Sequence, residues 1–326
     1  MFKRPDTIPY PLYVVTVVFN PVRFRRRWDL YEDFAKRCEE AGAILYTCAV
    51  AYGDRAFVLT PPGNDPMRLL QLCTSDELWI KENALNLLIQ RLPQDWKAVC
   101  NADADIQFVR DDWANEILHA LQHYHIVQPW TEADDLTDKY GHHQRHHSFV
   151  YSYKHNEPWP DEPGDYYGPG KPGKNKLFTW HPGFAWAYRR EAIQKLGGLI
   201  DIGILGSGDA HMAKALIGKA ETSIHPKLQQ AYKDIILRWQ SYATEHIKRN
   251  IGYVDGLILH HWHGPKAKRR YKSRWQILVK HEFNPLEDIK RDWQGLWQMT
   301  GNKPQLTEDI REYFRQRDED EPFIKS

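Results

Sequence analysis

The sequence predicts an α/β protein in which a mostly parallel sheet is wound by helices, and three observations support this fold class. β-branched runs such as YVVTVVF (residues 13–19) alternate with segments whose apolar residues recur every three or four positions, which is the pattern of strand, helix and strand. The strand-like runs end at loop-forming residues, as at Asn20-Pro21. The 326 residues include 42% hydrophobic side chains, which is enough for a sizeable core.

The first 129 residues are expected to supply most of this sheet. An amphipathic helix carries Leu30, Phe34 and Cys38 on one face and ends near Gly42. A second helix over residues 77–92 is stopped by Pro93, and a third begins at Asp111-Asp112 and runs to residue 124. Strands are predicted over residues 13–19, 43–51, 55–59, 96–100 and 125–129.

Residues 131–176 differ from the rest of the chain because they are polar and rich in Gly, Pro and aromatic side chains, with little periodicity. We expect a long mobile loop over a crevice at the sheet edge. Two short strands are predicted within residues 177–190, helices over 191–197, 226–249 and 266–280, and a strand over 257–263. We therefore predict one domain over residues 1–280, with 131–176 as an insertion, and a C-terminal extension over 281–326 whose acidic end lies at the surface.

The composition argues against several classes of protein. Lys and Arg (44) nearly balance Asp and Glu (43), giving a net charge of +1, so no global field favours a nucleic acid or a membrane surface. No apolar run approaches the ~20 residues that span a bilayer, and the N-terminus lacks a signal-peptide pattern. The four cysteines are scattered without a CxxC pair, as in reduced proteins. The expectation is a cytoplasmic protein without membrane insertion.

The motif NADADIQF places Asp103 and Asp105 directly after a predicted strand. Two carboxylates this close repel each other unless a cation lies between them. Ligands of parallel sheets bind at the carboxyl ends of the strands, where Asn20 and Asp54 are also expected to converge. The placement favours a divalent metal, although a DxD sequence can also be a turn or a helix cap.

The motif ILHHWHG supplies histidines that could complete such a site. On a continuous strand His261 and His263 share one face and His260 points the other way. Imidazole with carboxylate suits a first-row metal such as Mn²⁺, with Mg²⁺ as second choice; the alternative is a hydrogen-bonded histidine at a strand end. The basic run that follows could hold phosphate oxygens, form a solvated helix face, or bind nucleic acid; its candidate phosphate-binding residues are Lys266, Arg269 and Arg270.

Two further motifs carry titratable groups. Asp209 lies in the glycine-rich stretch GSGDAH, where it could accept a proton from an attacking hydroxyl or cap a helix. GHHQRHHSF adds His142, His143, His146 and His147. No thiolates accompany these histidines, so a structural zinc site is disfavoured there, and their role is left open.

Taken in order, four segments resemble the motifs of nucleotide-sugar-dependent glycosyltransferases of the GT-A fold, including phage and bacterial members: WIKENALNLLIQRLPQDWKAVCNADADIQF, HPGFAWAYRREAIQKLGGL, GSGD and HHWHG. The resemblance covers about residues 13 to 275. It implies a Rossmann-like sheet with a long active-site loop and a helical C-terminal part, and a metal-dependent transfer of a hexosyl or pentosyl group from a nucleoside-diphosphate sugar, preferably a UDP-sugar.

The resemblance also assigns roles to individual residues. Asp209 matches the base of inverting members, but the family often has two adjacent acids where this chain has Asp209 followed by Ala210, which leaves the stereochemical course open. The metal ligands would be Asp103, Asp105 and His263, with His261 as the second choice. The donor would be held by Asn20, Arg23, Asp54, Lys81, Asn83, Asp103, Gly183 and Trp186, together with the basic Lys266, Arg269 and Arg270.

Other functions remain as alternatives. A sugar nucleotidyltransferase would need a glycine-rich loop after the first strand, which is absent from the sequence. A metal-dependent phosphoester hydrolase and a non-catalytic glycan-binding module stay open. The acceptor could be a glycan, a protein, a metabolite or a modified base in phage DNA. Two basic clusters, Arg23 with residues 25–27 and Lys272 with Arg274, would suit a polyanionic acceptor; the alternative is that they only hold the nucleotide and face solvent.

Overall fold

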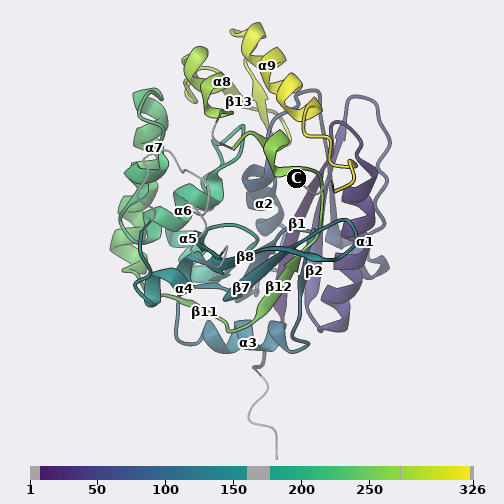
Figure 1. The fold of residues 1–326 in the computed structure, drawn as a ribbon, viewed down its shortest axis with the longest axis vertical. Helices are drawn as coiled ribbons and strands as arrows, with labels where there is room; N and C mark the ends of the chain where they lie inside the picture. Colours follow the sequence, from purple (N-terminus) through teal and green to yellow (C-terminus); the bar gives the residue numbers. More distant parts are fainter. Residues whose placement is uncertain (1–7, 160–176, 272, 324–326) are drawn as a thin grey trace, which may run out of the picture.

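The computed structural model describes residues 8–159, 177–271 and 273–323. A seven-stranded sheet with the order β11-β6-β10-β4-β1-β2-β3 forms its centre (Figure 1). β1 pairs in parallel with β2 and β4, β2 with β3, and β11 with β6, whereas β10 runs antiparallel to both of its neighbours. The predicted α/β class with a mostly parallel sheet is therefore confirmed. The strands are β1 (Leu12–Phe19), β2 (Ile44–Tyr52), β3 (Leu69–Thr74), β4 (Ala98–Ala102), β6 (Ile126–Gln128), β10 (Ala185–Arg189) and β11 (Ile251–Tyr253).

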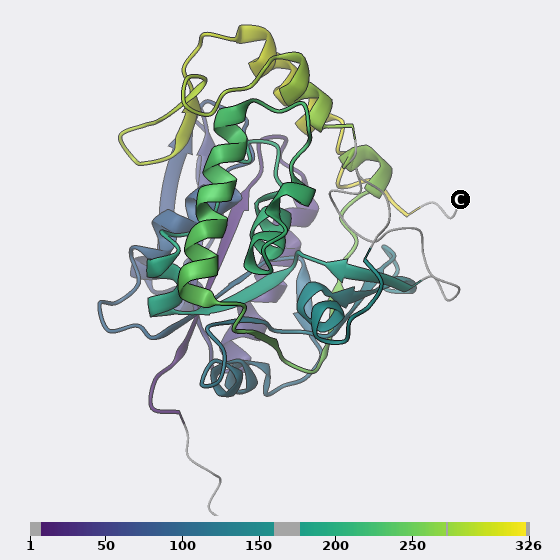
Figure 2. The same ribbon diagram turned by 90° about the vertical axis from the view of Figure 1, so that its left-hand side faces the viewer.

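Helices cover both faces of this sheet (Figures 1 and 2). Successive β1 residues alternate between two cores: Val14 faces one with Phe34 and Ile117, while Tyr13 and Val15 face the other. This alternation is the period-2 geometry of a strand buried on both sides. The first core is covered by α1 (Arg25–Glu40) and α3 (Trp113–Ala120), and the second by α2 (Lys81–Ile89), α5 (Arg190–Lys195), α6 (Gly208–Leu216) and α7 (Gln230–Tyr242).

A second sheet with the order β5-β12-β7-β8-β9 stands beside the first. Two of its strands and one helix fall where a mobile loop was predicted, so that prediction is wrong for residues 131–159; residues 160–176 lie outside the described part. β7 and β8 carry cross-strand ion pairs, such as Arg145 with Asp134. Because charged residues form these pairs, the two strands lack the alternation of apolar and polar residues by which a strand is usually predicted. The elements are β5 (Ile106–Phe108), β7 (Glu132–Leu136), β8 (His142–Ser148), α4 (Phe149–Lys154), β9 (Leu177–His181) and β12 (Leu257–His260).

Three predicted element boundaries are corrected by the structure. Residues 55–59 have no regular structure, and the strand beside β2 is β3. β12 ends at His260 and does not continue to His263. In place of a basic helix there is a 3₁₀ turn, Lys266–Arg269, followed by α8 (Trp275–Lys280), because Arg270 takes the left-handed conformation (φ 48°) that interrupts a helix.

The C-terminal residues pack onto the second core and lie at the top of Figure 1. A hairpin of β13 (Ile289–Arg291) and β14 (Trp297–Met299) precedes α9 (Pro304–Arg315). Tyr313 and Phe314 of α9 are buried, and so are Arg317 and Glu319 of the acidic end, whereas Asp320 is exposed. The expectation that this end lies at the surface is therefore wrong for Arg317 and Glu319 and holds for Asp320. Within the described residues, no helix combines the length and the apolar character needed to span a bilayer.

Candidate active site

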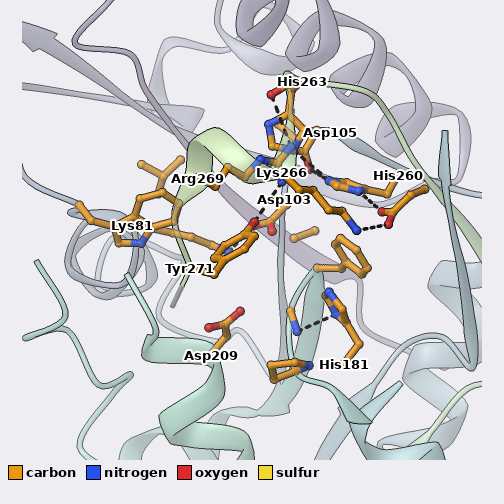
Figure 3. Close-up of a pocket in the computed structure, with 18 of the residues that line it drawn as sticks. Lys81, Asp103, Asp105, His181, Asp209, His260, His263, Lys266, Arg269 and Tyr271 are labelled. Atoms are coloured by element: carbon orange, nitrogen blue, oxygen red, sulfur yellow. Dashed lines mark hydrogen bonds and ion pairs between the residues drawn. The ribbon is translucent and has the colours of Figure 1, made fainter. Parts of the chain in front are cut away.

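A cavity of about 380 Å³ opens at the carboxyl ends of β1 and β4, between the two sheets (Figure 3). This volume falls in the range of sites for small ligands. Both sheets, the starts of α2 and α6, and the C-terminal segment contribute to its wall. Among the lining residues are Lys81, Glu82, Asp103, Asp105, Asp135, His146, His181, Gly183, Asp209, His260, His263, Lys266, Arg269, Arg274, Arg317 and Arg27.

Asp105, His260 and His263 come together because the chain crosses from one sheet to the other at this point. β4 ends at Ala102, and β5 begins at Ile106 in the second sheet, opposite His260. His263 Nε2 lies 3.2 Å from Asp105 Oδ2 and 3.0 Å from His260 Nε2. The ligand atoms of the three residues lie within 4.8 Å of one another.

The donor atoms of this group fit a divalent metal. Asp105 Oδ1 is buried and has no hydrogen-bond partner among the described residues. Burial, followed by the charge of Arg269, lowers the pKa of His263 to about 4, so the ring is neutral and can ligate near pH 7. Two imidazole nitrogens with one carboxylate favour Mn²⁺ over Mg²⁺, which prefers oxygen ligands.

The metal ligands predicted from the sequence differ in part from this group. His261 lies outside the three-residue group, because β12 ends at His260 and the strand alternation stops there. His260, assigned to the opposite face, takes its place at a spacing of three residues from His263. Asp103 also lies outside the group and forms an ion pair with Lys81.

Asp135 of β7 holds His260 from behind. His260 Nδ1 lies 2.5 Å from Asp135 Oδ1, which leaves Nε2 facing Asp105 and His263. The other oxygen of Asp135 lies 2.6 Å from His146 Nε2 and also accepts from Lys266. Burial would raise the pKa of Asp135, but His146 and His260 outweigh it and hold the pKa well below its usual range. A carboxylate behind a ligating histidine fixes the ring and its tautomer.

Asp209 lies across the cavity from the metal-type group, on the side of His181 (Figure 3). It belongs to the first turn of α6, and the N-cap is Ser207, so Asp209 does not cap the helix. Ser207 has φ 93°, a strained conformation for a non-glycine residue. One oxygen of Asp209 accepts from the Ala210 N–H at 2.8 Å. A side chain at Gly183 would lie 3.1 Å from the other, so Gly183 keeps this oxygen accessible.

Lys81 and Glu82 link the two sides of the cavity. Burial would lower the pKa of Lys81, but Asp103, then Glu82 and Asp209, raise it, so Lys81 is charged. Burial raises the pKa of Glu82 to about 7; the charge of Lys81 opposes this shift and that of Asp209 adds to it. Glu82 packs against the start of α6, where a Cβ on Gly208 would lie 2.7 Å from its Cδ. Glu82 is therefore a second carboxyl near Asp209, supplied by another helix.

We expect Glu82→Gln to change how stability depends on pH. The pKa of Glu82 is about 7 in the folded protein against 4.5 for an unperturbed glutamate, so the folded state binds more protons between these values and loses stability as the pH rises through them. The variant removes this cost, and its stability relative to the wild type should be about 3 kcal/mol higher at pH 8 than at pH 4. Urea unfolding of the metal-free proteins at both values measures the difference, and an equal difference at both would contradict the shift.

The predicted donor-binding residues divide into three sets by position. Lys81, Asp103, Gly183, Lys266 and Arg269 line the cavity. Asn20 and Asp54 were expected to converge on the same crevice as Asp103, but neither lines this cavity. Asn20 and Arg23 line a smaller neighbouring cavity of about 40 Å³, and Asp54 is exposed and lines neither of these two cavities.

Three of the predicted residues point elsewhere for clear reasons. Asn83 is buried and bonds to the C-terminal hairpin, at the Gly295 carbonyl and the Trp297 N–H. Trp186 is a core residue of β10 whose Nε1–H donates to the Pro182 carbonyl. Arg270 is exposed and bonds to Ser273 and Gln316.

The members of the basic clusters and of the histidine cluster have different surroundings in the structure and do not act as groups. Arg274, assigned to a basic cluster that would suit a polyanionic acceptor, is buried and donates to Tyr313 and Ser207; Lys272 lies outside the described residues. Of the four histidines around β8, His146 faces Asp135, whereas His147 lies 2.5 Å from Glu157. Among the described residues only Asp105, His260 and His263 form a metal-type group, so β8 does not supply one.

The chain was also compared with known proteins. No protein-family model matches it, and no curated protein matches it. Among solved structures it is similar to the catalytic domain of Drosophila β1,4-galactosyltransferase 7 in complex with xylobiose, with a TM-score of 0.32 and 11% identity over 66% of this chain and 63% of that chain; it thus spans less than two thirds of that structure. A mutant of the same Drosophila enzyme in complex with manganese, UDP-Gal and xylobiose has a TM-score of 0.38 and 9% identity over 92% of this chain and 98% of that chain. A Desulfovibrio desulfuricans protein named as a nucleotide-diphospho-sugar transferase has a TM-score of 0.31 and 9% identity over 94% of this chain and 97% of that chain.

Proposed function

We propose that this protein is a metal-dependent glycosyltransferase of the GT-A type that moves a sugar from a nucleoside-diphosphate sugar, preferably a UDP-sugar, to an acceptor hydroxyl. One observation carries the proposal. A single cavity holds the Asp105, His260 and His263 group on one side and Asp209 on the other (Figure 3). A transferase needs a cation for the leaving diphosphate and a base for the acceptor at such opposite positions.

Asp105, His260 and His263 would hold Mn²⁺, with Mg²⁺ as the weaker candidate. When bound, the ion would act as a Lewis acid for the diphosphate, an effect worth several kcal/mol in the transition state. The orphaned Asp105 Oδ1 supports this assignment, because a buried carboxylate oxygen without a partner is costly unless a ligand satisfies it. Asp103, which lies beside Lys81, would contact the donor.

The other residues of the cavity would bind the substrates and move a proton. Arg269 and Lys81 place fixed positive charge where the β-phosphate gains negative charge. Asp209 takes the proton from the acceptor hydroxyl, which then attacks the anomeric carbon as the bond to the diphosphate breaks. Attack from the side opposite the leaving group makes the reaction inverting. Trp79 and Phe178 in the wall exclude water that would otherwise hydrolyse the donor.

The acceptor is proposed as a hydroxyl of a glycan, a protein side chain or a metabolite. A modified DNA base was favoured by the two basic clusters, but Arg27 and Arg274 belong to the cavity wall and are engaged with Glu319 and with Tyr313. Arg23 and Arg25 of the first cluster are exposed, so a polyanionic acceptor would depend on these charges, and a modified DNA base stays as a further candidate acceptor.

A screen of nucleotide sugars tests the proposal. Each is added with Mn²⁺ or with EDTA, and both the melting temperature and the release of nucleoside diphosphate are measured. A bound donor should raise the melting temperature by mass action, and slow donor hydrolysis should require the metal. Metal-independent release of phosphate from simple phosphoesters would indicate a hydrolase, and donor binding without any turnover would indicate a binding module.

A further inference from the structure

His263 stands in a different structural setting from His260. His260 is the last residue of β12 and is backed by Asp135, whereas His263 lies in the loop that follows the strand. Because no strand pairing fixes a loop residue, other contacts must set the position of the His263 ring. The ring is nearly buried (11% of the side chain is exposed), and its Nδ1 lies 3.9 Å from Oε2 of Glu319.

Glu319 contacts three residues of the cavity wall at once. Its side chain is completely buried. It accepts from Arg27 through both oxygens, with Nε 2.5 Å from Oε2 and Nη2 2.6 Å from Oε1, and from Arg317 Nε at 2.8 Å. Burial would raise the pKa of Glu319, but Arg27 and Arg317 outweigh it and hold the pKa well below its usual range. The carboxylate thus balances two cavity arginines and faces His263.

The segment that carries Glu319, residues 317–321, interlocks with the loop that carries His263. A Cβ on Gly264 would lie 2.6 Å from the Asp318 carbonyl oxygen, so the two backbones are in direct contact. Trp262 Nε1–H donates to the Glu321 carbonyl at 2.8 Å. The next element is held as well: Asp320 accepts the backbone N–H groups of Arg25 and Arg26 at 2.9 Å, which caps α1 from outside.

We propose that Glu319 is a positioning residue of the metal site, and that the C-terminal segment 317–321 completes this site by fixing the His263 ring together with Arg27 and Arg317. Each ligating histidine then has a carboxylate behind it: Asp135 from the second sheet for His260, and Glu319 from the C-terminal segment for His263. Asp135 contacts the His260 ring directly at 2.5 Å, whereas Glu319 lies 3.9 Å from Nδ1 of His263 and acts on that ring through its charge, which favours a proton on Nδ1 and leaves Nε2 for the ion. The inference rests on the proposed function in one respect, namely that the site binds Mn²⁺.

Electron paramagnetic resonance of free Mn²⁺, titrated with the full-length protein, tests the role of Glu319 without relying on activity. Glu319→Gln should raise the Mn²⁺ dissociation constant about 10- to 100-fold, as loss of such partners does at other metal sites. The matched control is Asp318→Asn, the preceding residue, whose side chain is 49% exposed and pairs with Lys268. This control should stay within about twofold of the wild type, because an exposed pair contributes little.

Glu319→Gln also removes the negative charge that balances Arg27 and the buried Arg317, and this could unfold the segment, so a second variant is included. Glu319→Asp keeps the charge but withdraws the carboxylate by one methylene, and we expect it to fold and still to weaken Mn²⁺ binding. Thermal unfolding without metal reports folding separately. Wild-type affinity in folded Glu319→Asp or Glu319→Gln overturns the inference and leaves the proposed function standing. No Mn²⁺ binding by the wild type overturns the proposed metal dependence itself, and the inference with it.

Discussion

Replacing Asp105 by alanine is expected to abolish Mn²⁺-dependent transfer while the fold remains intact. Asp105 supplies the only carboxylate of the three-residue metal group among the described residues, and its buried Oδ1 has no hydrogen-bond partner there. If the ion contributes about 4 kcal/mol to transition-state stabilisation, the loss in kcat/KM is about 10³-fold. The melting temperature of the metal-free variant should remain close to that of the wild type, because removing a partly buried charge whose Oδ1 has no hydrogen-bond partner offsets the loss of the contact with His263.

The structure supplies a control for this experiment within the same motif. His261→Ala changes a histidine adjacent to His260, but His261 lies outside the metal group. We therefore expect His261→Ala to retain Mn²⁺-dependent activity and His263→Ala to lose it. Both variants are assayed with and without EDTA. Full activity of Asp105→Ala, or wild-type activity that EDTA does not change, would refute the metal assignment. Loss of activity in His261→Ala but not in His263→Ala would instead make His261 the metal ligand, as a continuous strand would place it.

The sequence was informative where local pattern and long-range packing agree. β1 and β4 are apolar because both of their faces are buried, so their strand character and the placement of Asp103 and Asp105 at a strand end could be predicted. β7 and β8 could not, because ion pairs between them, such as Asp134 with Arg145, make both strands polar. A polar strand with few apolar residues has the same composition as a loop, so it can be recognised as a strand only once its pairing partner is known.

The metal group shows how three residues of strand length change a prediction. Had β12 continued to residue 263, His261 and His263 would share a face; since it ends at His260, the residues that meet are three apart. The spacing of the motif is compatible with both pairs, His261 with His263 and His260 with His263, and the position at which β12 ends decides between them. Glu319 left no local signal at all, because it meets Arg27 across 292 positions of the chain. Contacts of this kind depend on the docking of the C-terminal segment.

Asp209→Asn is expected to lose sugar transfer while it still binds the donor. The asparagine keeps the size of the side chain and can still accept from the Ala210 N–H, as Oδ1 of Asp209 does now, but it cannot take a proton. Removing a general base lowers kcat by about 10²- to 10⁴-fold, whereas the donor dissociation constant, measured by calorimetry with Mn²⁺, should change little. Asp201→Asn is the matched control, since it removes a carboxylate that pairs with Arg291 at 2.6 Å and does not line the cavity.

The carboxyl group of Glu82 is the alternative base, and the pH dependence of the Asp209→Asn variant distinguishes the two. Glu82, with a pKa raised to about 7 by its burial, lines the cavity and packs against the start of α6 that carries Asp209. If Asp209 is the base, the residual activity of Asp209→Asn stays low across pH 6 to 9. If that activity instead rises as the pH passes 7 and disappears in the double variant with Glu82→Gln, then Glu82 takes the proton and the role given to Asp209 is wrong. Loss of donor binding in Asp209→Asn would make Asp209 a donor ligand, and the base would have to lie elsewhere in the cavity.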